Sequence, residues 1–426
     1  MNKSSLKKSA QKNSESEESD CLCEENSSGG VIKNKSASKS VDLVSQKIKD
    51  DQILVDELEK PFNGNGKKGY KEYCEEFASL MSKKCQEYPD MQVALFTHAF
   101  PDPDALGSLM GMQWLLRKAF GVESQLFYHG EVSHPQNNAM VNLLDPQLHK
   151  VNSEYRPSEF KMNILCDTVP KNAGTGDHKV NFDVVIDHHK ECYVNGYKGL
   201  MIHIKTGSCS SIVYQLMSYF CRESNWLDKS IDQDVKVATA LIAGIYTDTE
   251  NMMSDDSTEL EFTAFQDLFQ YRHSNFLKQI VFFKRPKSWV DLKSTACREA
   301  QIDESGHAIV GLGVIPEKSR DIIADMADEM VSWAGVDTAI CFAVVGDENI
   351  MGSVRSLNAS VSVSELCKTF GGRFGSGGGK LGKGAYQYSL AGMSIDPDDD
   401  EESQQKLWSV LKEKEIKRIL RLMEVV

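Results

Sequence analysis

The sequence lacks the features that would place the protein in a membrane or in an oxidising compartment. No run of about 18 uninterrupted apolar residues occurs, so no membrane span is expected. The first residues include lysines but no apolar segment after them, which argues against a cleavable signal peptide. The 11 cysteines are scattered, and no Cys-x-x-Cys pair suggests a zinc or redox site. These absences predict a reduced, cytoplasmic compartment.

Basic residues are also fewer than acidic residues. The chain carries 48 Lys and Arg against 62 Asp and Glu, a formal net charge of −14. Proteins that bind long nucleic acids neutralise phosphates with a basic face, so this balance argues against duplex nucleic acid as a partner. A short nucleotide held by metal cations and a few basic side chains needs no such face. The charge therefore favours small phosphate-bearing substrates.

Composition and patterning predict a tail and two domains. Residues 1–66 are rich in Ser, Lys, Asn and Glu and lack periodicity, so they are expected to be disordered. Strands and helices alternate from Val93 to Asp187, which indicates a mainly parallel α/β sheet in a first domain over residues 67–300. A smaller α/β domain is expected over residues 301–426, with a cleft between the two.

Acidic and imidazole side chains follow the first expected strand. The run His98-Ala99-Phe100-Pro101-Asp102-Pro103-Asp104 comes directly after the apolar segment 93–97 and before an expected helix over 105–119. Open α/β sheets bind ligands at the carboxyl ends of their strands. Carboxylate oxygens suit Mg²⁺ and Mn²⁺, and imidazole shifts the preference toward Mn²⁺ or another transition metal. This stretch is therefore a candidate metal site.

Further candidate ligands follow other expected elements. Asp187-His188-His189 follows a strand over 184–186, Asp167 follows a strand over 162–166, and Asp248 follows a helix over 235–246. A single Asp in such a place is usually a turn former or a helix cap, and adjacent histidines can be ordinary surface residues. The joint pattern, with several such groups at element ends in one segment, indicates one metal centre.

These residues stand in the order of the four motifs of the DHH phosphoesterases, which the sequence resembles over about residues 89–425. The nearest subgroup comprises the oligoribonucleases (nanoRNases) and pAp phosphatases that carry a C-terminal DHH-associated domain. The resemblance implies two divalent cations, Mn²⁺ in preference to Mg²⁺ or Co²⁺. It implies that one cation is held by His98, Asp102 and Asp167, and the other by Asp104, Asp167, His188 and Asp248.

The resemblance also implies a reaction. Asp187 would orient its neighbours and His189 would face the scissile phosphate. Two cations about 3.5–4 Å apart lower the pKa of a bridging water and neutralise charge on the phosphoryl oxygens. The expected activity is hydrolysis of short oligoribonucleotides or of 3′-phosphoadenosine 5′-phosphate (pAp). The alternatives are a cyclic-dinucleotide phosphodiesterase, an inorganic pyro- or polyphosphatase, and a non-catalytic nucleotide-binding protein. The oligomeric state stays open, with a homodimer among the options.

Two features of the second domain are candidate substrate contacts. Ser353-Val354-Arg355-Ser356 resembles a segment of the DHH-associated domain in which the Arg binds substrate phosphate, although an exposed Arg on a strand is an equal alternative. The glycine-rich stretch 370–386 is interpreted as an anion-binding loop and not as a flexible linker. The family has His where Lys380 stands, which leaves the substrate open. The candidate contacts in this loop are Gly378, Gly379, Lys380 and Lys383.

Overall fold

The computed structural model describes residues 69–189, 196–346, 348–390 and 400–423. The tail that we expect to be disordered, residues 1–66, lies outside this part of the chain. No described helix combines the length and the apolar character that a membrane span needs. The boundary expected at residue 300 falls between helix α11 (Lys287–Glu299) and strand β7 (Gln301–Ile302), and the domain limits stay predictions.

The described strands form two six-stranded sheets, and every pairing in the first sheet is parallel. Its strand order is β3-β2-β1-β4-β5-β6, so the order reverses between the neighbours β1 and β4. Ligands of open α/β sheets bind at the carboxyl ends of strands at such a reversal. This sheet confirms the α/β class. Its strands are β1 (Gln92–Phe96), β2 (Glu123–Tyr128), β3 (Leu148–Lys150), β4 (Phe160–Cys166), β5 (Val184–Asp187) and β6 (Leu200–His203).

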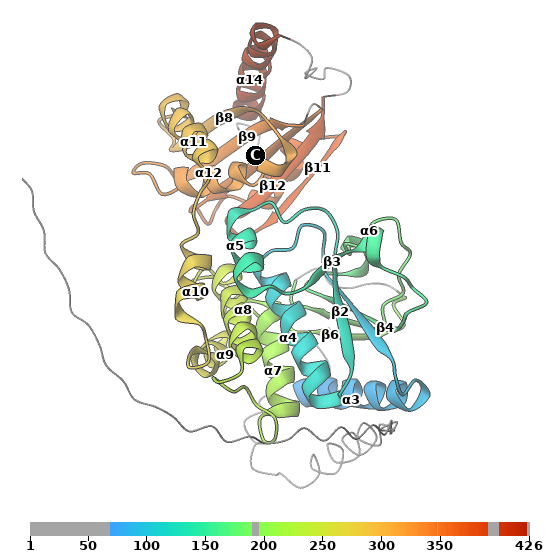
Figure 1. Ribbon diagram of the computed structural model, residues 1–426. Helices are drawn as coiled ribbons and strands as arrows, with labels where there is room; N and C mark the ends of the chain where they lie inside the picture. Colours follow the sequence, from blue (N-terminus) through green and yellow to red (C-terminus); the bar gives the residue numbers. More distant parts are fainter. Residues whose placement is uncertain (1–68, 190–195, 347, 391–399, 424–426) are drawn as a thin grey trace, which may run out of the picture. The chain divides into compact units, whose positions relative to one another are not determined.

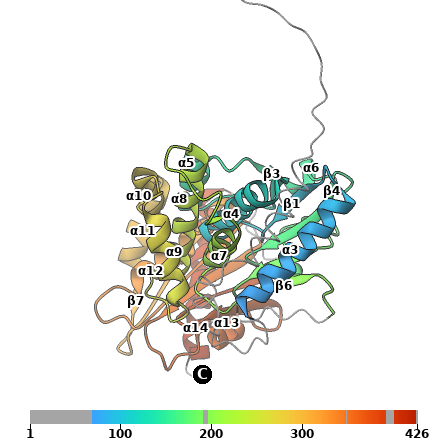
Figure 2. The same cartoon turned by 90° about the horizontal axis from the view of Figure 1, so that it is seen from below.

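Both faces of the first sheet are covered. Along β1, Val93 and Leu95 enter one core cluster, whereas Ala94 and Phe96 enter another. Helices α4, α7 and α8 run side by side over the first of these faces (Figures 1 and 2). A strand buried on both faces reads as a continuous apolar run, as this one does. The helices of this part are α3 (Tyr70–Glu87), α4 (Pro103–Phe120), α5 (Pro135–Leu144), α6 (Val151–Glu154), α7 (Cys209–Cys221), α8 (Asp232–Asp248), α9 (Glu259–Phe269), α10 (Ser274–Val281) and α11.

Helix α4 is buried along almost its whole length and presents its N-terminus to the reversal point. Asp102 caps it, because its carboxylate accepts hydrogen bonds from the backbone N–H groups of Asp104 and Ala105. Close packing on α8 requires Gly107, since a Cβ there would lie 2.7 Å from the carbonyl oxygen of Ala240. Tight packing therefore fixes the position of the two aspartates at its start.

The second sheet is mixed, with the order β11-β12-β10-β9-β8-β7 and only the β8–β9 pair parallel. Helices α11 and α12 pack on one face, and α13 and α14 pack on the other. The elements that follow β7 are β8 (His307–Ile315), α12 (Ile322–Met330), β9 (Thr338–Val345), β10 (Asn349–Ser356), α13 (Val363–Gly371), β11 (Gly375–Lys380), β12 (Lys383–Ser389) and α14 (Glu401–Met423).

The glycine-rich stretch is mostly a β-hairpin, so its interpretation as a loop is wrong for strands β11 and β12. Glycine is rare in strands, which is why the sequence did not predict one here. Helix α13 explains the exception because it lies directly on β11. A Cβ at Gly377 would overlap the carbonyl oxygen of Cys367 on that helix. These glycines therefore allow close backbone packing.

Candidate metal centre

The carboxyl ends of three neighbouring strands deliver candidate ligands to one place. His98 lies two residues after β1, Asp167 directly follows β4, and Asp187 ends β5 with His188 next in the chain. The N-terminus of α4 adds two aspartates and the last residue of α8 is Asp248. The result is three overlapping groups of potential ligands: Asp167, His188 and His189; His98, Asp102 and Asp167; and Asp104, His188 and Asp248.

The first expected set of ligands meets around His98. Its Nε2 atom lies 3.5 Å from Asp167 Oδ2 and 4.0 Å from Asp102 Oδ1. The other ring nitrogen, Nδ1, donates a hydrogen bond to the carbonyl oxygen of Ala99 at 2.9 Å. A histidine ligand is usually held in this way, since a bonded Nδ1–H leaves Nε2 free for a metal.

The second expected set meets around His188. Its Nε2 lies 3.2 Å from Asp248 Oδ2, 3.4 Å from Asp167 Oδ1 and 3.9 Å from Asp104 Oδ2. Its Nδ1 donates a hydrogen bond to the carbonyl oxygen of Thr206 at 3.0 Å. Asp167 thus turns one oxygen toward His98 and the other toward His188. This is the arrangement that a bridging carboxylate requires.

Asp104 is held by the start of helix α7 and lies in the first turn of α4, because α4 begins two residues earlier than expected. Its two oxygens accept hydrogen bonds from the backbone N–H groups of Cys209 at 2.7 Å and Ser210 at 2.8 Å. A helix N-terminus stabilises a carboxylate because its N–H groups and its dipole both favour negative charge. The Asp104 carboxylate is therefore anchored in place.

Two buried carboxylate oxygens without a hydrogen-bond partner among the described residues bear on whether the site can bind a metal. Asp167 Oδ1 and Asp248 Oδ2 are buried and, among the described residues, have no hydrogen-bond partner, although both lie near His188 Nε2. An unsatisfied buried acceptor is costly, and a cation removes that cost. Oxygen donors with imidazole nitrogen suit Mn²⁺, Mg²⁺ and similar divalent ions. The residues therefore fit divalent metal ions.

Charge in the cluster shifts the ionisation of its members. Burial alone would lower the pKa of His98, but Asp167 and Asp102 outweigh burial and raise it to about 10. His188 follows the same pattern, with its pKa raised by Asp167 and Asp248 against burial. Burial and then Asp167 raise the pKa of Asp104. These shifts favour protonated imidazoles beside the carboxylates, so a cation that binds at the imidazole nitrogens must displace protons.

Asp187 positions both histidines that follow it. Its Oδ1 accepts hydrogen bonds from the ring Nδ1–H of His189 at 2.7 Å and from the backbone N–H of His188 at 3.0 Å. The bond from the His189 ring is the main cause of the raised pKa of His189. The His189 side chain is half exposed, whereas Asp187 is fully buried. A fixed, accessible imidazole therefore stands beside the acidic cluster.

The expected substrate contacts separate into two groups. Lys380 Nζ lies 3.2 Å from Asp248 Oδ1, and Lys383 Nζ lies 2.8 Å from Glu250 Oε1, so the hairpin that holds Gly378 and Gly379 reaches the cluster. Arg355 does not reach it. Its guanidinium is bound to both oxygens of Asp328 on α12, at 2.5 and 3.2 Å, and to Ser353 Oγ.

The sequence reasoning missed Glu261, which supports His188 through Thr206. This carboxylate is fully buried and accepts hydrogen bonds from the hydroxyls of Thr206, at 2.6 Å, and Ser211. It also accepts the backbone N–H of Thr258 at 2.8 Å, which completes a capping box at the start of α9. The Thr-x-x-Glu spacing predicts that capping box. It gives no indication that the same Glu fixes Thr206.

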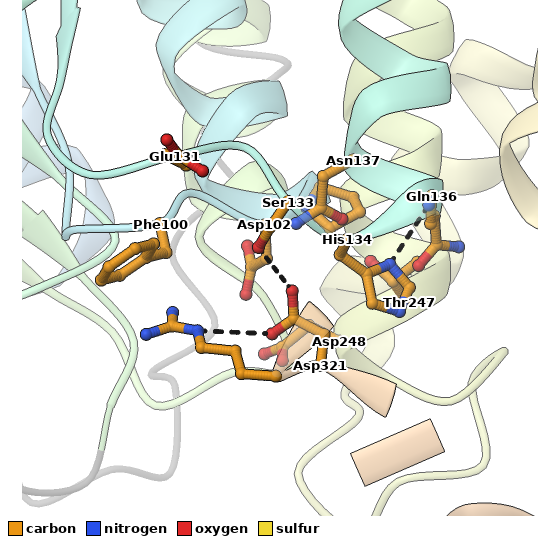
Figure 3. Close-up of a pocket in the computed structure, with 12 residues that line it drawn as sticks. Phe100, Asp102, Glu131, Ser133, His134, Gln136, Asn137, Thr247, Asp248 and Asp321 are labelled. Atoms are coloured by element: carbon orange, nitrogen blue, oxygen red, sulfur yellow. Dashed lines mark hydrogen bonds and ion pairs between the residues drawn. The ribbon is translucent and has the colours of Figure 1, made fainter. Parts of the chain in front are cut away.

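A cavity of 290 Å³ opens beside the cluster (Figure 3). Asp102 and Asp248 form part of its wall. Phe100, Glu131, Ser133, Arg320 and Asp321 are among the other residues that line it.

Comparison with known families identifies the segment that carries most of the candidate ligands, from His98 to His188. Residues 92–245 match the DHH family, N-terminal domain. The chain therefore contains a segment that matches the N-terminal domain of the DHH family, which confirms the resemblance inferred from its motifs. A solved structure, that of an exopolyphosphatase-related protein from Bacteroides fragilis, has the same fold with a TM-score of 0.57 at 15% identity. It covers 83% of this chain, and 98% of that chain is matched.

Three curated relatives align at 25–26% identity. One is an uncharacterized protein of Methanocaldococcus jannaschii (26%), aligned over 68% of this chain and 57% of its own length. Another is the cyclic-di-AMP phosphodiesterase PdeA of Listeria monocytogenes (26%), aligned over 73% of this chain and 47% of its own length. The bifunctional oligoribonuclease and PAP phosphatase NrnA of Bacillus subtilis (25%) aligns over 70% of this chain and 90% of its own length. The chain thus spans only about half of the first two.

Proposed function

We propose that this chain is a divalent-metal-dependent phosphoesterase that hydrolyses short oligoribonucleotides, pAp, or both. One observation carries the proposal: Asp167 lies between two groups of ligands, and buried oxygens of Asp167 and Asp248 have no hydrogen-bond partner among the described residues. Structural carboxylates in a protein interior are normally paired. Unpaired ones at the carboxyl ends of parallel strands support a site for cations and a phosphate ligand.

The roles of the side chains follow from their contacts. His98, Asp102 and Asp167 would hold one cation, and Asp104, Asp167, His188 and Asp248 a second. Bound there, the cations would lower the pKa of water and neutralise charge on the phosphoryl oxygens. Asp104 is anchored by α7 and His188 by Thr206, so neither side chain needs to reorganise when a ligand binds.

His189 and Lys380 are the groups that would act on the substrate. Asp187 keeps the His189 Nδ1 protonated, and the raised pKa of His189 favours an imidazole that donates hydrogen bonds to phosphate oxygens. Burial alone would lower the pKa of Lys380, but Asp248 outweighs it, so the ammonium stays charged. That charge sits beside the cluster, where a phosphate would bind. Lys383, which pairs with Lys380 across the hairpin, would extend the positive charge along it.

The names of two relatives support two classes of substrate. NrnA is named as an oligoribonuclease and PAP phosphatase, and 90% of its length aligns with this chain, which supports short oligoribonucleotides and pAp. A cyclic-dinucleotide phosphodiesterase is the second candidate, since PdeA aligns over a similar share of this chain. The donor set supports Mn²⁺ first, with Mg²⁺ and Co²⁺ as further options.

The test is a panel of hydrolysis assays with the full chain and Mn²⁺. The substrates are RNA of two to five nucleotides, pAp, cyclic di-AMP and inorganic pyrophosphate. Release of mononucleotides or AMP that is lost in both Asp104→Ala and His188→Ala supports the proposal. Turnover of cyclic di-AMP alone moves the assignment to the second candidate. Turnover of pyrophosphate alone, or of no ester despite bound Mn²⁺, would refute the proposed function.

A further inference from the structure

The cavity beside the cluster has an excess of negative charge. Of the described residues that line it, four are carboxylates, namely Asp102, Glu131, Asp248 and Asp321, and Arg320 alone carries a fixed positive charge (Figure 3). A phosphate that enters this cavity meets strong repulsion unless cations offset it. Arg320 is therefore the protein's own counter-charge inside the cavity.

The guanidinium of Arg320 is held in place, but not all of its hydrogen-bond donors are paired within the described chain. Its central carbon lies 3.5 Å from the centroid of the Phe100 ring, a cation–π contact. Its Nε lies 3.7 Å from Asp321 Oδ1, and Asp321 Oδ2 in turn accepts a hydrogen bond from the Ser133 hydroxyl at 2.7 Å. Within the described parts of the chain, neither terminal nitrogen of Arg320 has a hydrogen-bond partner. The side chain is only 20% exposed.

The backbone under Arg320 is strained. Phe100 has a φ of 60°, in the left-handed region that bulky residues rarely adopt. Such a conformation is energetically unfavourable and persists only where its surroundings enforce it. Here the Phe100 N–H donates to the carbonyl oxygen of His129, and the ring lies against Gly130, where a Cβ would come within 2.7 Å. The strain presents the ring two residues before Asp102.

Arg355 and Arg285 provide a contrast. Both oxygens of Asp328 occupy the guanidinium of Arg355, the arginine that the family resemblance assigns to phosphate. Arg285 has the same two kinds of partner as Arg320, the ring of Phe283 at 4.9 Å and the carboxylate of Asp325, but both Asp325 oxygens bind its guanidinium. Arg320 alone among these three keeps free donors that face a cavity.

We propose that Arg320, supported by the ring of Phe100, binds a phosphate group of the substrate next to Asp102 and Asp248. The planar guanidinium can donate two parallel hydrogen bonds to phosphate oxygens. Its permanent charge offsets the four carboxylates. The inference rests on the proposed function and deepens it, because it assigns the recognition of the phosphate to a residue outside the family motifs.

The experiment measures phosphate binding and turnover separately. Inorganic phosphate is titrated by calorimetry into the Mn²⁺-loaded full chain, and hydrolysis of a diribonucleotide is followed in parallel. The variant R320Q should weaken phosphate binding by about 10- to 100-fold, the range for hydrogen bonds to charged groups, and raise the KM to match. Its Mn²⁺ affinity should stay at the wild-type value, because Arg320 touches no proposed metal ligand.

Three further variants keep the test decisive. The control R285Q removes an arginine that has the same kinds of partner but does not line the cavity, and it should bind phosphate like the wild type. R320K keeps a charge in a folded site but not the planar fork, so its loss should fall between the two. F100L should weaken binding by a few-fold, because the cation–π support is removed.

The outcomes separate this inference from the proposed function. Wild-type phosphate affinity in R320Q would overturn the role of Arg320 in phosphate binding. An equal loss of phosphate affinity in R285Q, or a loss in R355Q alone, would overturn it as well. If the wild type hydrolyses no ester, the proposed function fails. The phosphate titration still decides the role of Arg320 in that case.

Discussion

Buried carboxylates beside the two sheets of this protein differ in their hydrogen bonding. Around the first sheet, buried oxygens of Asp167 and Asp248 lack hydrogen-bond partners within the described chain. Against the second sheet, Glu415 on α14 is equally buried, yet it accepts hydrogen bonds from Tyr386 (3.2 Å), Tyr388 (2.5 Å) and Arg418 (2.7 Å). Burial of an acid therefore does not mark a metal site, whereas unpaired buried oxygens beside an imidazole Nε2, as in Asp167 and Asp248, support the proposed one.

Glu261 shows that the difference lies in pairing and not in the region of the chain. It lies beside the cluster and is fully buried, but all its hydrogen-bond partners are hydroxyls and an N–H group. Glu261 thus supports His188, a proposed metal ligand, through Thr206 and belongs to none of the groups of potential ligands. Four variants test the contrast between paired and unpaired acids.

The largest effect is expected at the central carboxylate. Asp167→Asn keeps the size of the side chain but removes the charge shared between the two groups of ligands. We expect loss of stoichiometric Mn²⁺ binding and a fall in turnover of about 10³-fold or more, because bound cations contribute several kcal/mol to such reactions. Calorimetric Mn²⁺ titration and diribonucleotide hydrolysis measure both. A folded variant that binds Mn²⁺ normally would refute the distinction between the two kinds of acid.

Glu415→Gln probes the paired acid. Removal of one partner from a buried ionic network leaves Arg418 uncompensated, so the free energy of unfolding should fall by about 3 kcal/mol. Mn²⁺ affinity should not change, because no proposed metal ligand contacts Glu415. Urea unfolding and Mn²⁺ titration provide the two readouts. A drop in Mn²⁺ affinity equal to that in the Asp167 variant would contradict the comparison.

Glu261→Gln should produce an intermediate effect on the metal. The amide cannot accept the same set of hydrogen bonds, so Thr206 and hence His188 lose their fixed position. Outer partners of metal ligands typically contribute 10- to 100-fold to metal affinity, and we expect a loss in that range. Glu72→Gln is the matched control, since Glu72 is also a capping-box glutamate, at the start of α3. Normal Mn²⁺ affinity combined with lower stability would make Glu261 purely structural.

The smallest effect is expected at Asp325 and depends on pH. Burial alone would raise the pKa of Asp325, but hydrogen bonds from Arg285 and Lys293 outweigh it and hold the pKa below its ordinary value. The ionised form therefore stabilises the fold above the unfolded pKa of about 3.9, and that contribution is lost as the pH falls through the folded value. Asp325→Asn should unfold more easily by about 1 kcal/mol at pH 7.

The gap between wild type and Asp325→Asn should narrow as the pH falls below about 4 and close once the pH lies below the lowered pKa of the folded state, where the wild-type carboxyl is protonated as well. Urea unfolding at pH 7 and pH 3 measures this gap. A gap that grows on acidification would show that the sign of the pKa shift is wrong.

Much of the site could be predicted because it depends on local signals. An apolar run such as 93–97 predicts a strand, and polar residues at the ends of parallel strands meet at one edge of the sheet. His98, Asp102, Asp167 and His188 were placed near one another by this reasoning alone, and the structure brings them together. The α/β class followed from the same alternation of strands and helices.

The remainder depends on contacts between segments that are distant in the sequence. Gly377 reads as a loop residue, and only its contact with α13 explains why it lies in a strand. The bond between Glu261 and Thr206 spans 55 residues. The stacking of Arg320 on Phe100 joins residues more than 200 positions apart. No local pattern encodes such pairs.

The most direct test of the account is the stoichiometry of Mn²⁺ bound to the full chain, measured by elemental analysis after equilibrium dialysis, with Asp167→Asn in parallel. We expect two Mn²⁺ ions per chain in the wild type and fewer than one in the variant. Absence of bound Mn²⁺ in the wild type, or two ions in both proteins, would contradict the proposal that the unpaired carboxylates form a metal centre.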